Sequence, residues 1–111
     1  MPLVRLPELI AYAQQLLAEM DIQGSIIGHV GDGNFHTIIA ARPEDYAGVQ
    51  TFSERLVRQA LAWEGTASGE HGIGLVKRGF MVEEHGASVE WMRRLKALFD
   101  PDNLLNPGKL I

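Results

Sequence analysis

The stretch GHVGDGNFH, residues 28–36, decides the fold, because it predicts a chain reversal between two short strands. Isoleucine-rich residues 25–30 precede the Asp-Gly pair at positions 32 and 33, and residues 34–41 follow it. An Asp-Gly pair between two such runs is typical of a β-hairpin closed by a two-residue turn. The sequence therefore predicts an antiparallel hairpin over residues 25–41.

Helical patterns surround the hairpin. Pro7 lies at a helix start, and the first apolar stripe consists of Leu9, Ile10, Ala13, Leu16, Leu17 and Met20. A second amphipathic helix begins at Pro43-Glu44-Asp45, and its apolar face is formed by Val49, Phe52, Leu56, Ala60 and Trp63. After a glycine-rich loop over residues 64–74 we expect a short helix over residues 76–84 and a last helix from Ser88, its N-cap, to Asp100.

These elements predict the α+β class, with one two-stranded antiparallel hairpin and about four helices in a single domain, residues 1–111. An isolated pair of strands is marginally stable in water and leaves both edges open. We therefore expect a partner or a second copy of the chain to complete the sheet. A homodimer that joins two hairpins is the expected form.

Composition excludes several classes of function. The formal net charge is −4 and no basic run occurs, which argues against nucleic acid as a partner. Cysteine is absent, so neither disulfides nor thiolate metal ligands are available. No apolar run reaches the roughly 20 residues of a membrane span, and no signal peptide is recognisable. We expect a soluble, cytoplasmic protein.

The hairpin is a candidate metal clamp. A two-residue turn at Asp32-Gly33 places His29 opposite His36, with Cβ atoms about 4.5–5.5 Å apart. Two imidazoles at that separation can share one cation, and a carboxylate such as that of Glu70 would complete a His2Glu set with an open position. The alternative is that both histidines are ordinary strand residues. Asp32 is better explained as a turn residue than as a ligand.

A second glycine-rich stretch, SGEHGIG at residues 68–74, carries Glu70 and His71. Neighbouring side chains reach one site only where the backbone bends, and the glycines allow such bending. If Glu70 binds the metal, His71 lies beside it and the cation keeps its imidazole neutral, able to accept a proton. The alternative is a solvated surface loop without a function.

Three motifs together resemble the C-terminal signature of the FAD-linked 2-hydroxy acid dehydrogenases, which are vanillyl-alcohol-oxidase-type flavoproteins. They are GHVGDGNFH at residues 28–36, GEHGIG at residues 69–74 and NPGK at residues 106–109, and the match covers essentially the whole chain in the same order. The segment ALFDP at residues 97–101 most resembles the branch of cytochrome-linked D-lactate dehydrogenases, next to the glycolate oxidase large subunit. Half of a ferredoxin-like cap followed by C-terminal helices is the fold that the resemblance implies.

The resemblance also implies roles for single residues. His29, His36 and Glu70 would bind a divalent metal, zinc or manganese, and His71 would take the proton of the substrate hydroxyl as hydride leaves for the flavin. Asn106 would lie towards the flavin. The substrate would be a small 2-hydroxy acid. Ile38 replaces an asparagine found in some relatives, which favours a smaller or more apolar substrate than hydroxyglutarate.

The sequence departs from this family in one large respect. It offers no GxGxxG after a strand and no room for a dinucleotide site, so we expect the FAD-binding domain to be absent and FAD not to bind this chain alone. An FAD-binding subunit encoded separately would then be the partner. Two alternatives stay open. One is a non-enzymatic metal-binding or interaction module left by loss of the flavin domain, and the other is a zinc hydrolase, which the absence of HExxH disfavours.

Overall fold

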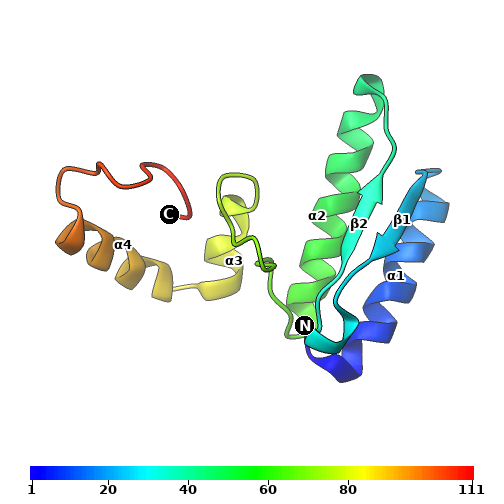
Figure 1. Cartoon of the computed structure of the whole chain (residues 1–111), viewed down its shortest axis with the longest axis horizontal. Coiled ribbons are helices and arrows are strands. Elements are labelled where there is room, and N and C mark those ends of the chain that lie inside the picture. Colours follow the sequence, from blue (N-terminus) through cyan, green and yellow to red (C-terminus); the bar gives the residue numbers. More distant parts are fainter. The chain divides into compact units, whose positions relative to one another are not determined.

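The computed structural model describes all residues from 1 to 111 and divides them into two compact units, Met1–Thr66 and Ala67–Ile111. The first unit contains helix α1 (Leu6–Glu19), strands β1 (Gly24–Ile27) and β2 (His36–Ile39), and helix α2 (Tyr46–Ala62). The second contains helices α3 (Met81–His85) and α4 (Ser88–Phe99) (Figure 1). Short 3-10 turns lie at Leu3–Arg5, Val30–Asp32, Pro43–Asp45 and Arg78–Phe80. The predicted α+β class, with one two-stranded antiparallel sheet and four helices, is confirmed.

The core of the first unit forms where α1 and α2 pack together against one face of the sheet (Figure 1). Leu16 and Leu17 of α1 and Phe52 of α2 are buried, and Ile39 of β2 packs against them. The stripe predicted for α1 is therefore the buried one, because residues spaced by three or four lie on one side of a helix. Burial of apolar side chains between the two helices and the sheet stabilises the hairpin, since two strands alone are only marginally stable.

The register of the hairpin differs from the predicted one. His36 pairs with Ile27, not with His29. Strand β1 ends at Ile27, four residues before Gly31, where a two-residue turn at Asp32-Gly33 would require it to end. The intervening residues form a 3-10 turn at Val30–Asp32, in which the N–H groups of Asp32 and Asn34 both donate to the carbonyl of His29, at 2.9 and 3.3 Å. Gly33 then closes the turn with φ of +72°, a left-handed conformation that suits glycine.

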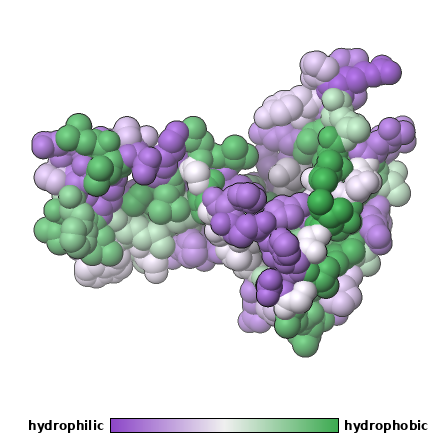
Figure 2. Space-filling model, in the orientation of Figure 1, coloured by the Kyte–Doolittle hydropathy of each residue, from purple (hydrophilic) through white to green (hydrophobic).

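The other face of the sheet is not covered by the helices of its unit. Directly paired residues point to the same side, so Ile27 and His36 share this face with Ser25 and Ile38. Ile27 and Ile38 are more than half exposed, whereas His36 is half-buried. Hydrophobic surface lies over the strands in Figure 2. One of the two motif histidines therefore lies on an open, largely apolar surface.

The second unit also has buried residues. Ala67, Met81 and Val89 are buried there, together with the carboxylate of Asp100. Ser88 begins α4 but does not cap it, which corrects the predicted cap: the preceding Ala87 is already helical and the N–H of Val89 donates to Gly86 at 3.2 Å. Gly86, with φ of +52°, provides the turn before the helix. None of the helices in either unit combines the length and the hydrophobicity needed to cross a lipid bilayer.

Candidate functional site

The end of the hairpin carries the first two candidate ligands. His29 is exposed and precedes the 3-10 turn, where its carbonyl oxygen is the acceptor for two backbone N–H groups. His36 opens β2, seven residues later. The predicted cross-strand pairing of the two imidazoles is wrong, since the longer turn moves His29 out of the ladder. Asp32 lies inside the turn, in agreement with its interpretation as a turn residue.

Gly28 is a glycine on which this local structure depends. It lies opposite Phe35, and a Cβ atom at position 28 would be 2.3 Å from Phe35 Cα and 2.6 Å from the carbonyl oxygen of Asn34. Both obstacles are backbone atoms, so no rotamer change can relieve the overlap. The first glycine of GHVGDGNFH is thus required by the close approach of the two chain segments that flank the turn.

Glu70 and His71 occupy the two central positions of a tight turn. The N–H of Gly72 donates to the carbonyl of Gly69 at 3.0 Å, and Gly72 has φ of +78°. A turn of this kind lets the side chains of two consecutive residues, here Glu70 and His71, lie close enough to contact the same ligand. The Oε1 atom of Glu70 lies 3.6 Å from Nε2 of His71, and the two side chains are 42% and 84% exposed, respectively. The structure therefore brings the predicted carboxylate and the predicted base together on one exposed turn.

The end of this loop is tied to the C-terminal motif. The N–H of Leu110 donates to the carbonyl of Gly74 at 2.9 Å, and Nη1 of Arg78 donates to the carbonyl of Gly108 at the same distance. Gly108 has φ of +73°, which explains the glycine of NPGK. Two motifs that are separated by about thirty residues thus lie side by side within the second unit.

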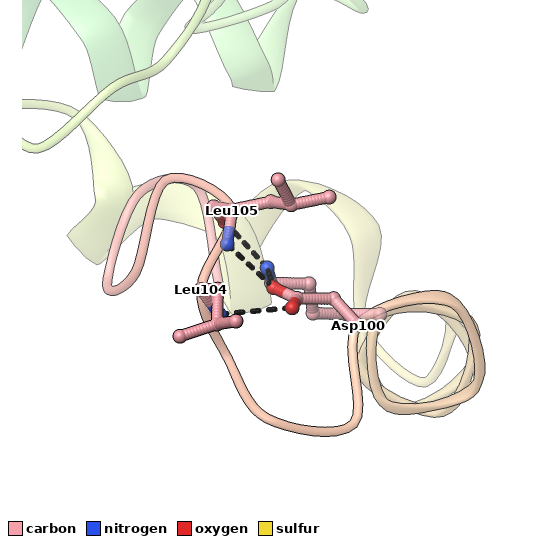
Figure 3. A network of polar contacts seen from close by, with 4 residues as sticks. Asp100, Leu104 and Leu105 are labelled. Carbon is pink, nitrogen blue, oxygen red and sulfur yellow. Dashed lines mark hydrogen bonds and ion pairs between the residues drawn. The ribbon is translucent and has the colours of Figure 1, made fainter.

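Asn106 follows a polar network centred on Asp100 (Figure 3). Asp100 is only 8% exposed, and its carboxylate accepts the N–H groups of Leu104 and Leu105 at 2.8 and 2.9 Å. The ammonium of Lys96 contacts the same carboxylate and also donates to the carbonyl of Leu105 at 2.5 Å. Asn106 itself is exposed, with φ of +45°, and its carbonyl accepts the N–H of Lys109 at 3.2 Å. The network fixes the backbone immediately before the residue proposed to face the flavin.

This network has a consequence at acid pH. The hydrogen bond from Lys96, followed by those from Leu104 and Leu105, lowers the pKa of Asp100 below its ordinary value of 3.8, although desolvation opposes the shift. A carboxyl whose pKa is lowered by folding stabilises the folded state above its unfolded pKa, and that contribution disappears as the pH falls through the folded pKa.

We expect the amide resonances of Leu104 and Leu105 to titrate together with a midpoint below 3.8, and the midpoint to rise in Lys96→Met. A midpoint at or above 3.8 in the unsubstituted chain would contradict this.

The candidate metal ligands come from both units. His29 and His36 belong to the first, and Glu70 belongs to the second. No group of three or more His, Asp or Glu side chains surrounds a common point in the structure. The donor types nevertheless suit the ions named above, because imidazole and carboxylate bind zinc and manganese well.

Two acidic residues of the second unit have structural roles that no sequence motif indicates. Glu84 accepts the N–H of Ala67, just before the glycine-rich stretch at residues 68–74, and Asp100 holds the segment before Asn106. In the sequence Asp100 marks only the end of a helix, and its position before Pro101 gives no further signal. Glu84 lies in a run of acidic residues, where nothing in the sequence separates it from its exposed neighbour Glu83.

Comparison with known proteins identifies the family of the chain. The family described as "FAD linked oxidases, C-terminal domain" matches residues 1–110, and the chain belongs to this family. The chain is 51% identical to "Probable D-lactate dehydrogenase, mitochondrial" of Danio rerio, over 99% of this chain and 23% of the relative. It is 46% identical to "D-lactate dehydrogenase [cytochrome] 1, mitochondrial" of Saccharomyces cerevisiae, over 78% of this chain and 15% of the relative.

A plant relative extends the same pattern. The chain is 38% identical to "D-lactate dehydrogenase [cytochrome], mitochondrial" of Arabidopsis thaliana, over 99% of this chain and 20% of the relative. The chain thus spans less than a quarter of the length of these relatives. The predicted family and its D-lactate dehydrogenase branch are confirmed.

Proposed function

We propose that this chain is the metal-binding, substrate-orienting portion of an FAD-dependent dehydrogenase for small D-2-hydroxy acids, of the D-lactate or glycolate kind. The observation that carries the proposal is the exposed turn at residues 69–72, which holds Glu70 next to His71. The names of the relatives support D-lactate as the substrate. FAD is the cofactor that the family's description supports, and a flavin would accept the hydride.

Different residues of the chain are proposed to bind the metal and to accept the proton. Glu70, with His29 and His36, is proposed to hold zinc or manganese, and an ion of this kind would supply Lewis acidity at the hydroxyl and carboxylate oxygens of the substrate. His71, 3.6 Å from Glu70, is proposed to take the proton of that hydroxyl at Nε2. Proton removal leaves the oxygen electrons free to form the carbonyl as hydride departs, so the product is a 2-oxo acid.

The exposed face of the sheet is proposed to border the substrate. His36 lies between the apolar residues Ile27 and Ile38 on this face, and apolar neighbours limit the water that competes for a metal-bound oxygen. Ile38 offers no hydrogen bond, which favours a substrate with a short side chain. Asn106 is proposed to lie towards the flavin, at the end of the segment that Asp100 fixes.

We also propose two kinds of partner, and a non-enzymatic metal-binding or interaction module is the alternative function. An FAD-binding subunit and a homodimer joined at the open strand edges would each complete part of the assembly. A module that binds metal without catalysis would keep the ligands and lose the response to substrate.

The test is reconstitution. We expect the chain, mixed with the separately produced remainder of a D-lactate dehydrogenase relative, to support dye reduction that depends on D-lactate and on added Zn²⁺ or Mn²⁺. L-lactate at the same concentration is the matched control, because it differs only in the configuration of the carbon that carries the hydroxyl. The proposal fails if the mixture reduces no more dye than the flavin-containing portion alone.

A further inference from the structure

The glycine-rich stretch at residues 68–74 is held, at the residue just before it, by a side chain from α3. The Oε2 atom of Glu84 accepts the N–H of Ala67 at 3.0 Å across seventeen positions of sequence, and Oε1 lies 3.7 Å from Nε2 of His85. The side chain of Glu84 is only 11% exposed and Ala67 is 3% exposed. A covered carboxylate is unfavourable unless its oxygens are hydrogen-bonded, and a bond from a backbone N–H to a charged acceptor is stronger than a neutral one.

Ala67 lies three residues before Glu70, so the anchor is close to the residues that the proposed chemistry uses. The loop between them and beyond contains Gly69, Gly72 and Gly74, each of which leaves the backbone many conformations. The far end is already fixed, because the carbonyl of Gly74 accepts the N–H of Leu110. Glu84 provides the corresponding restraint at the near end. With both ends fixed, the turn that carries Glu70 and His71 has far fewer arrangements available.

We propose that Glu84 is a positioning residue, whose bond to the N–H of Ala67 sets the placement of Glu70 and His71 for metal and substrate binding. This inference rests on the proposed function of those two residues. Glu84 itself does not touch the ion or the substrate. It acts as partners of metal ligands commonly do, since such partners usually change affinity by about 10–100-fold when they are replaced.

The test compares three substitutions of Glu84 in the full chain. Glu84→Ala removes the acceptor, Glu84→Asp keeps the charge but shortens its reach, and Glu84→Gln keeps a carbonyl oxygen at the same distance along the side chain. We expect Mn²⁺ affinity, measured by calorimetry, to fall about 10-fold in the Ala and Asp variants. In the Gln variant it should return to within about 3-fold of the original value, because the amide oxygen can still accept the N–H. Val82→Ala is the control on the same helix, because the side chain of Val82 is exposed, and it should leave the affinity unchanged.

A second measurement separates the anchor from the metal site. Amide hydrogen exchange at Ala67, followed by NMR without metal, should accelerate about 10-fold in the Ala and Asp variants and stay slow in the Gln variant. If the unsubstituted chain takes up no Mn²⁺ while Ala67 exchange behaves as expected, the proposed function fails and the anchor stands. If the Asp variant binds Mn²⁺ as tightly as the unsubstituted chain, Glu84 does not position the site. The Asp variant keeps this test decisive even where Glu84→Ala does not fold.

Discussion

Gly28→Ala is expected to lower the free energy of unfolding of the first unit by about 3 kcal/mol, near the upper end of overpacking effects. The added Cβ would lie 2.3 Å from Phe35 Cα and 2.6 Å from the carbonyl oxygen of Asn34, and neither backbone atom can move without disturbing the hairpin. Relief of the overlap would require the two segments to separate, which would break the Ile27–His36 pair next to it. The substitution therefore acts on the fold and on the placement of His36 together.

Urea denaturation followed by the fluorescence of Trp63 measures this effect. A Trp91→Phe background assigns the signal to the first unit, where the ring of Trp63 lies against Tyr12 with centroids 6.3 Å apart. Gly31→Ala is the matched control, because a Cβ at position 31 meets nothing within 4 Å and the φ of Gly31 is not positive. Equal denaturation midpoints for the two variants would show that the close approach at Gly28 does not limit stability.

His36→Ala is expected to lower the affinity of the chain for Zn²⁺ or Mn²⁺ more than about 100-fold. This loss exceeds the roughly 10–100-fold loss that is typical when a residue hydrogen-bonded to a metal ligand is replaced. The reason is that the proposed ligand set would lose one of its two imidazoles, and the remaining donors would not complete the coordination shell. His36 lies on the exposed face of the sheet, so its removal opens no cavity in the core between α1 and α2. Metal content by elemental analysis and affinity by calorimetry both report the loss.

His85→Gln is the control for the loss of a histidine. His85 is the one histidine outside the two motif loops, and its imidazole lies 3.7 Å from the Glu84 oxygen that does not hold Ala67. Metal affinity should therefore stay unchanged in this variant. If His36→Ala retains the full metal content of the unsubstituted chain, the proposed ligand set is wrong.

Local patterns in the sequence predicted most of the elements. The stripe from Leu9 to Leu17 predicted the buried face of α1, because helical periodicity depends only on spacing along the chain. The reversal between two strands was predicted from glycines and β-branched residues in the same way. Its register was not, because the choice between a two-residue turn and a 3-10 turn depends on contacts that the turn residues make in the folded unit.

The sequence by itself determined the family, since three short motifs in fixed order carry that information without any knowledge of their contacts. The sequence also predicted that the side chains of Glu70 and His71 lie close together, because this requires only a bend in a glycine-rich loop. The tertiary structure decided that Glu84 meets Ala67, that Arg78 meets Gly108 and that Asp100 holds the backbone before Asn106. Each of these contacts joins a common surface residue type to a backbone group, and for Glu84 and Asp100 it is burial that distinguishes the residue from its exposed neighbours. Burial is set by how the elements pack together, and no local pattern in the sequence records it.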